Sequence, residues 1–499
     1  MMMNNFEINV VSPNKFGAIG DSITDDTRAF QEAISFAQDT GATLDGLGKT
    51  YLISDVMGKI PPSVGSTRID YGLYINKSIT IKNTKLKLKD NCKDFTTVLN
   101  IYSPKDSFVN IENVIINGNK ENQMHTSDRE DGGMHGIRIY GNTRLAETGY
   151  IHINKCSINN CQSDGLLFRA ISPQRAVIEN CSFIMNTRNG MTDNALDNVN
   201  IKNCIFSGTK GTYPESGYHC EPDDYQIISC RVIEGCITKN NVTGFRFDIR
   251  PGNCDGITIK DCYSSDNEGI SFITESSETN PRFFRKITID NCNMNQIIFS
   301  HNTSESGAGI GGYNNIRISN CTLSNNIGIT FKSLNAGIGK QISVENCYGN
   351  IMFVGGFQGV NIKNLTSKLT ENTQRGVNGL YITTMKDLVI DSCNFENINS
   401  SISVSIDLRN GNYENVKIKN CSFKTDGYSI FVKGDKIFID GNTFYARGSW
   451  NYCTRGENTT NVIYSNNIHV NKQVNGTIPS GVYVENLPLE AIKTNNIIV

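Results

Sequence analysis

Residues 259–272 read IKDCYSSDNEGISF, and the same arrangement of residues recurs along most of the chain. The first half, Ile-x-Asn/Asp-Cys, returns at intervals in the twenties, as from Cys156 to Cys181 (25 residues) and on to Cys204 (23 residues). The second half is a polar turn, then Gly, then alternating apolar residues. This alternation predicts strands. A repeat of this length built from short strands predicts a parallel β-solenoid, whereas a β-propeller needs about 40–45 residues per blade.

The cysteines of the repeat are expected to form a column inside the solenoid, where a free Cys behaves as a small apolar residue. The chain has 16 Cys, and the C-x₂-C pairs typical of zinc sites do not occur. We therefore expect core packing, with no metal and no cofactor. The copies that end in Cys do so at Cys156, Cys181, Cys204, Cys236, Cys262, Cys292, Cys321, Cys347, Cys393 and Cys421.

Charge and hydropathy exclude several function classes. Among 499 residues the net charge is −2, so a nucleic-acid partner is not expected. The start, MMMNNFEINVVSPNKFG, lacks a basic segment followed by an apolar one, so no secretory signal peptide is expected. No stretch approaches eighteen consecutive apolar residues, so no membrane insertion is expected.

A short α-helix is predicted near the N-terminus, where Phe30, Ala33, Ile34 and Ala37 recur at helical spacing and Gly41 follows. Such a helix can cover the open end of a solenoid, as terminal repeats must. The chain then divides into an N-terminal segment with the capping helix, the parallel β-helix and a closing or subunit-contact segment. These parts span residues 1–50, 51–470 and 471–499.

The segment NKFGAIGDSITDDTRAFQEAI resembles the opening of the pectate-lyase-like single-stranded right-handed β-helix proteins, with Ser22 where Gly is commoner. That family includes bacteriophage tailspike depolymerases and relatives of the polygalacturonases. IINGNKENQ at 115–123 resembles the segment that enters the main helix in the same proteins. The resemblance implies an all-β, right-handed parallel β-helix that processes a polysaccharide. In phages it implies a homotrimer in the virion tail, assembled in the host cytoplasm with other tail proteins and acting on bacterial surface polysaccharide.

The outward side chains follow from the Gly that precedes each second strand. Positions one and three after this Gly are apolar and should fill the core, so positions two and four should face outward. After Gly217 this rule buries Cys220 and turns His219 and Glu221 outward. On the next coil it turns Arg246 and Asp248 outward.

Neighbouring coils are about 4.8 Å apart, so these side chains are expected to form one charged patch. The alternative is a solvated face whose charges only pair with one another. Asp193 has an inward position in this register and joins the patch only if a bulge lies there. The residues expected to bind substrate are Arg246, Arg169, Arg138, Tyr140, Arg250 and Asp193.

Glycoside hydrolysis needs one protonated and one ionised carboxyl group on either side of the scissile bond. Glu221 and Asp248 have equivalent positions on neighbouring coils, and like-charge proximity would raise the pKa of one of them. We therefore predict a hydrolase of acidic capsular or exopolysaccharide, with Glu221 as general acid, Asp248 as nucleophile or base, and His219 as a third catalytic residue.

A polysaccharide lyase is the alternative enzyme, because Arg246 or Arg169 could neutralise a uronate while His219 or Tyr140 acts on the ring proton. A non-catalytic glycan-binding fibre is the third reading. The acidic run EPDD at 221–224 could attract Ca²⁺, but Pro222 constrains it and no metal site is expected. His125, His135 and His152 are expected to be ordinary surface or hydrogen-bonded histidines.

Overall fold

The computed structural model forms two compact units, one of residues 1–253 with 262–269, the other of residues 254–261 with 270–499. The structure describes residues 10–498 except 58–70, 125–132, 142–145, 170, 196, 223–226, 250–252, 277–281, 304–311, 325–327, 334–338, 370–378, 398–403, 426–427, 447–453, 472–483 and 486–491. Within each unit the described strands pair in parallel, as a β-solenoid requires.

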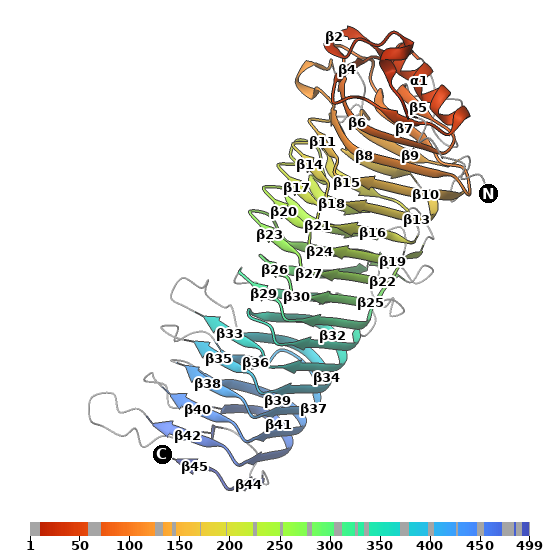
Figure 1. Ribbon diagram of the computed structural model, residues 1–499. Helices are drawn as coiled ribbons and strands as arrows, with labels where there is room; N and C mark the ends of the chain where they lie inside the picture. Colours follow the sequence, from red (N-terminus) through yellow and green to blue (C-terminus); the bar gives the residue numbers. More distant parts are fainter. Residues whose placement is uncertain are drawn as a thin grey trace, which may run out of the picture. The chain divides into compact units, whose positions relative to one another are not determined.

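The predicted N-terminal helix is present as α1 (Thr27–Thr40) and ends at Gly41, which has the left-handed φ of 72° that ends many helices. Its apolar face is fully buried, with Phe30 against the ring of Tyr51. Gln31 attaches the helix to the first coils, since its side-chain amide donates to the carbonyl of Tyr74 and accepts from the N–H of Tyr74. Figure 1 shows α1 beside β5, which it contacts.

Each coil of the first unit contributes to three parallel sheets, and β6 and β8 run through two of them. Sheet 1 consists of β5 (Tyr71–Ile75), β7 (Thr97–Tyr102), β9 (Ile137–Tyr140), β12 (Leu166–Arg169), β15 (Asn189–Asp193), β18 (Ser216–Cys220) and β21 (Thr243–Asp248). Sheet 2 consists of β1 (Val10–Val11), β3 (Thr43–Asp45), β6 (Ile79–Leu88), β8 (Phe108–Asn117), β10 (Ala146–Asn154), β13 (Ile171–Glu179), β16 (Val199–Lys202) and β19 (Ile227–Glu234). Sheet 3 consists of β2 (Asp21–Asp25), β4 (Thr50–Ile53), parts of β6 and β8, β11 (Ser157–Asn159), β14 (Ser182–Ile184), β17 (Ile205–Ser207), β20 (Ile237–Lys239) and β23 (Tyr263–Ser265).

The second unit repeats this three-sheet plan. One sheet contains β24 (Ile270–Ser276), β27 (Ile297–Thr303), β30 (Ile329–Ser333), β32 (Ile351–Lys363), β34 (Leu380–Asp391), β36 (Ile406–Leu408), β39 (Ile430–Asp440), β41 (Thr454–Ser465) and β43 (Val484–Glu485). Another contains most of β22 (Asn253–Lys260), β25 (Phe283–Asp290), β28 (Gly312–Ser319), β31 (Gly339–Glu345), parts of β32, β34, β39 and β41, β37 (Tyr413–Lys419) and β44 (Ile492–Thr494). The short strands of the third are β26 (Asn293–Met294), β29 (Thr322–Leu323), β33 (Thr366–Leu369), β35 (Asn394–Asn397), β38 (Ser422–Thr425), β40 (Thr443–Ala446), β42 (Ile468–Asn471) and β45 (Ile497–Ile498).

The Asn-Cys motif has a clear physical role. Asn180 and Asn203 have positive φ values of 55° and 50°, the left-handed conformation that Asn tolerates better than most residues. Their side-chain amides also hydrogen bond from coil to coil, with Asn203 donating to Asn180. The Cys that follows turns inward: Cys181 and Cys204 are buried, and each thiol lies 3.1–3.2 Å from the carbonyl two residues earlier. The predicted cysteine column is thus part of the core.

The parallel pairing runs beyond both ends of the 51–470 range expected from the sequence. β1 and β3 already pair in parallel before residue 51. β44 and β45 pair in parallel with β41 and β42 after residue 470. Among the described helices, none is long and apolar enough to cross a membrane.

Candidate active site

Sheet 1 carries the candidate site on β15, β18 and β21. In the register, Thr192 lies opposite His219, and His219 lies opposite Arg246. One residue further along, Cys220 lies opposite Phe247, and both side chains are fully buried. Side chains therefore alternate between the core and the outer face, as predicted.

The Cys220 thiol belongs to the core and not to the site. Burial raises its pKa to about 12, so the thiolate that attacks carbon or binds a metal is strongly disfavoured. Among the residues that the structure describes, no cluster of three His, Cys, Asp or Glu side chains could hold a metal ion.

The outer face is less open than the sequence predicts. His219, Arg246 and Asp248, expected on an exposed patch, retain only 2%, 7% and 2% of their accessible surface. Tyr213 accounts for part of this burial, because its ring lies 5.1 Å from the Arg246 guanidinium and its hydroxyl accepts a hydrogen bond from Arg246 Nη2. The side chain of Glu221 is 38% exposed, so solvent reaches this carboxylate most readily.

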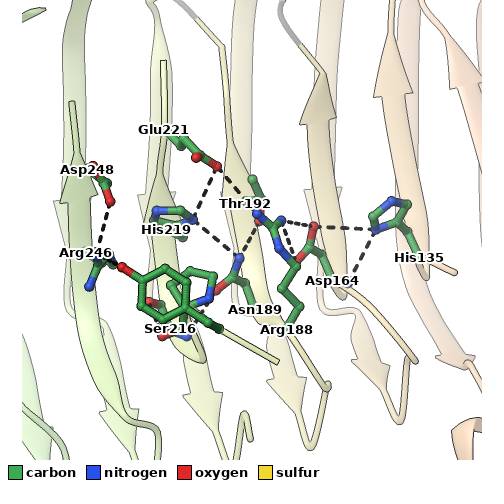
Figure 2. Close-up of polar contacts among 12 residues, drawn as sticks. His135, Asp164, Arg188, Asn189, Thr192, Ser216, His219, Glu221, Arg246 and Asp248 are labelled. Carbon is green, nitrogen blue, oxygen red and sulfur yellow. Dashed lines mark hydrogen bonds and ion pairs between the residues drawn. The ribbon is translucent and has the colours of Figure 1, made fainter. Parts of the chain in front are cut away.

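A continuous chain of polar contacts leads to Glu221 along the turns that enter β9, β12 and β15 (Figure 2). Nδ1 of His135 lies 3.5 Å from the carboxylate of Asp164, which is fully buried. Arg188 Nη1 lies 3.1 Å from the same carboxylate, and its Nη2 lies 3.5 Å from Glu221 Oε2. Arg188 therefore links a buried carboxylate to a partly exposed one.

His219 lies on the other side of Glu221, with Nδ1 3.8 Å from Glu221 Oε2 and 3.4 Å from Asn189 Nδ2. The Asn189 amide is oriented by two further contacts, because its Oδ1 accepts the N–H of Ser216 and its Nδ2 donates to Thr192. Nδ1 of the imidazole therefore faces both the amide of Asn189 and the carboxylate of Glu221.

Glu221 and Asp248 have the same position on neighbouring strands, each one residue beyond the Cys220–Phe247 pair. Their carboxylates turn toward different partners, Glu221 toward Arg188 and Asp248 toward Arg246 at 3.0 Å (Figure 2). A guanidinium favours the ionised form of the carboxylate beside it. The electrostatics of the pair are therefore set by arginines as well as by the like-charge repulsion expected from the sequence.

Asp193 corrects one sequence prediction, because it does not reach the outer face. Its side chain is fully buried in the solenoid, where Arg231 Nε lies 3.0 Å from Oδ2 and Tyr218 donates to the same oxygen at 2.7 Å. The regular inward position holds, and no bulge turns the carboxylate outward. Asp193 therefore cannot bind a substrate on the surface of sheet 1.

The remaining expected ligand residues lie on β9 and β12. Arg138 and Tyr140 are each 3% exposed, with the Arg138 guanidinium 5.0 Å from the Tyr140 ring centre. Arg169, opposite Tyr140 on the next strand, is exposed. Arg250 lies outside the described residues.

Asp164, Arg188, Asn189 and Tyr213 belong to the site but were not predicted from the sequence. Asp164 and Asn189 directly precede Gly165 and Gly190, and Arg188 precedes Asn189. The register rule starts at these glycines, so it ignores the turn in front of them. The available signal was the charged and amide residues placed at this same turn in successive repeats.

Comparisons with known proteins identify the fold. A family model described as a right handed beta helix region matches residues 71–227. A mutant tailspike protein of Escherichia coli bacteriophage HK620, solved in complex with a pentasaccharide, is 11% identical with a TM-score of 0.53, covering 87% of this chain and 78% of that chain. No curated protein matches the chain.

Two other similar structures have lower TM-scores. The A-module of a mannuronan C-5 epimerase from Azotobacter vinelandii is 13% identical with a TM-score of 0.37, covering 91% of this chain and 98% of that one. The pre-mature gene product 12 of bacteriophage phi29 is 12% identical with a TM-score of 0.45, covering 98% and 72%. The protein is a right-handed parallel β-helix, and its fold is of the tailspike type.

Proposed function

We propose that this protein hydrolyses an acidic polysaccharide of the bacterial surface on the outer face of sheet 1, with Glu221 and Asp248 as the two catalytic carboxylates. The observation that carries the proposal is their equivalent position at the ends of two neighbouring strands, since Glu221 directly follows β18 and Asp248 is the last residue of β21, each beside a guanidinium. Two carboxyl groups flanking one bond are the basic requirement of glycoside hydrolysis.

The contacts of the two carboxylates support different roles. Asp248 is buried and lies 3.0 Å from Arg246, a charge-assisted contact that keeps it ionised and suits a base or nucleophile. Glu221 has longer contacts of 3.5 Å and 3.8 Å and is partly exposed, so it can exchange a proton with solvent and suits the general acid. His219 contacts Glu221 on the side opposite Arg188, with Nδ1 3.8 Å from Oε2, and is a positioning residue.

A lyase is the second candidate, favoured by the position of His219 between Arg188 and Arg246. A guanidinium could neutralise a uronate carboxylate while His219 or Glu221 removes the ring proton. This reaction also requires an acidic substrate, so the substrate class alone does not separate the two chemistries. Their products differ, because only elimination leaves an unsaturated sugar.

The test is to incubate the protein with a panel of acidic capsular and exopolysaccharides and to follow reducing ends together with the ultraviolet absorbance of unsaturated uronates. New reducing ends without that absorbance support hydrolysis, and both signals together support the lyase. Retained binding with neither signal would leave a glycan-binding fibre. Glu221→Gln and Asp248→Asn should each lower the rate at least about 10²-fold, whereas exposed Tyr263→Ser should not.

The proposed function also includes where the protein acts and in which oligomeric state. The HK620 tailspike protein shares the fold and was solved with an oligosaccharide, which supports a role in a virion tail at the bacterial surface. We propose a homotrimer in that setting, assembled with other tail proteins. Light scattering of the purified protein measures the oligomeric state, and a monomeric mass at micromolar concentration would contradict the trimer.

A further inference from the structure

Arg138 on β9 is a buried cation, and two of its donor atoms lack a partner in the part of the chain that the structure describes. The residue is 3% exposed, and the two atoms are Nε and Nη1. A buried charge is normally paired, because removing it from water without compensation costs free energy. The Tyr140 ring, 5.0 Å from the guanidinium, orients the group but does not supply a negative charge.

A second positive charge lies beside Arg138 and adds to its uncompensated charge. Arg169 on β12 is exposed and adds a second positive charge beside it. Burial, followed by the charge of Arg169, lowers the pKa of Arg138 to about 10. The two cations therefore mark a place where a bound anion would remove a repulsion.

Asn100 adds an unused acceptor. It lies opposite Arg138 on β7 and is fully buried, and among the described residues its Oδ1 has no hydrogen-bond partner. Its Nδ2 faces the carbonyl of Thr97 at 3.4 Å, which directs Oδ1 to another partner. A simple anion could satisfy Arg138 but not Asn100, because Asn100 Oδ1 needs a donor. A sugar with both a carboxylate and a hydroxyl offers both groups.

We propose that Arg138, Arg169 and Asn100 form a subsite for an acidic sugar, with its carboxylate on Arg138 and a hydroxyl donating to Asn100 Oδ1. Arg169 lies at the exposed side and attracts the carboxylate. This subsite rests on the proposed function, in which the same face binds a polysaccharide.

The subsite lies several strands away from the candidate catalytic residues. β12 and β9 are two and three strands away from β18, which at about 4.8 Å per strand is about 10 and 14 Å. The acidic sugar is therefore recognised away from the bond that Glu221 and Asp248 cleave. Its carboxylate selects the polysaccharide and takes no part in the bond cleavage.

The test measures binding of D-glucuronate, with D-glucose, acetate and sulfate as comparison probes, by ligand-observed NMR on the full chain. Glucuronate should bind, glucose should not, and Arg138→Met should weaken glucuronate binding at least tenfold. Arg169→Gln should weaken it less. Without ligand, Arg138→Met should unfold at a temperature no lower than the wild-type protein, because the unpaired charge is gone.

Several results would overturn the subsite. These are no glucuronate binding by the wild-type protein, equal binding by Arg138→Met, or equal binding of acetate and sulfate, which would indicate a simple anion site. Glu221→Gln separates this proposal from the proposed function, because it should abolish cleavage and leave glucuronate binding unchanged. Glucuronate binding without any cleavage would contradict the hydrolase alone, and cleavage without it would contradict the subsite alone.

Discussion

Asp193 and Arg231 form an ion pair inside the first unit, with Oδ2 and Nε 3.0 Å apart and both side chains fully buried. The pair lies directly beneath the candidate site, since Asp193 follows Thr192 on β15 and its second partner, Tyr218, precedes His219 on β18. A charged pair of this kind contributes little net stability when intact but costs much when broken.

Replacing one member should therefore destabilise the protein strongly. Asp193→Asn leaves Arg231 buried without its counter-charge, and we expect a loss of about 3–5 kcal/mol in the free energy of unfolding. The double variant Asp193→Leu/Arg231→Met removes both charges and should recover most of that loss. Urea denaturation of the single and double variants measures both values, and additive losses would contradict the coupling.

The pair also illustrates which features of the fold can be predicted from the sequence and which cannot. Period-2 alternation correctly buries Cys220, and the repeat predicts the parallel solenoid, because both depend on local patterns. Arg231 lies opposite Val199 in the register, at an inward position, and Asp193 is inward as well. Two opposite charges at inward positions predict a buried pair, yet a rule applied to sheet 1 alone does not include Arg231 of sheet 2.

The geometry of the site depends on contacts between residues that are far apart in the sequence. The contact of Tyr213 with Arg246 joins residues 33 positions apart, and no strand periodicity indicates it. The link from Asp164 through Arg188 to Glu221 crosses two coils at turn positions that have no fixed inward or outward direction. The sequence therefore predicts which strands carry the site but not how deeply its side chains are buried.

Arg188 should control the pH range of catalysis. Its guanidinium lies 3.5 Å from Glu221 and favours the ionised carboxylate. Arg188→Gln removes that charge, so a general acid at Glu221 should stay protonated to higher pH, and the basic limb of the pH–rate profile should move upward. Arg188→Lys keeps the charge and serves as the control. An unmoved limb in Arg188→Gln would assign the acid to another group.

Cleavage should invert the configuration at the anomeric carbon. Neighbouring strands are about 4.8 Å apart, and Glu221 turns toward Arg188 on the side away from Asp248 (Figure 2). We therefore expect the gap between the two carboxyl groups to exceed the about 5–5.5 Å of retaining enzymes and to leave room for a water molecule. Proton NMR of the first product formed gives the anomer, and retention would require Glu221 to leave Arg188 during catalysis.

In the second unit, His469 of β42 should make stability depend on pH. Its ring stacks on Phe444, 5.1 Å between centres, and burial lowers its pKa to about 4. In the unfolded chain the pKa of His is about 6.5. The folded protein therefore binds fewer protons than the unfolded chain between these values. The stabilisation is complete above pH 6.5 and is lost as the pH falls toward 4, by about 3 kcal/mol in total.

His469→Phe removes this titration and extends the aromatic stack of Phe395, Phe423 and Phe444. We expect the variant to lose less stability than the wild-type protein between pH 7 and pH 4.5 in urea denaturation. Tyr464→Phe is the matched control, because it removes the hydroxyl that lies 2.9 Å from His469 Nε2 but keeps the titrating ring. The control should retain the pH dependence, and an equal slope in His469→Phe would show that this histidine does not titrate on unfolding.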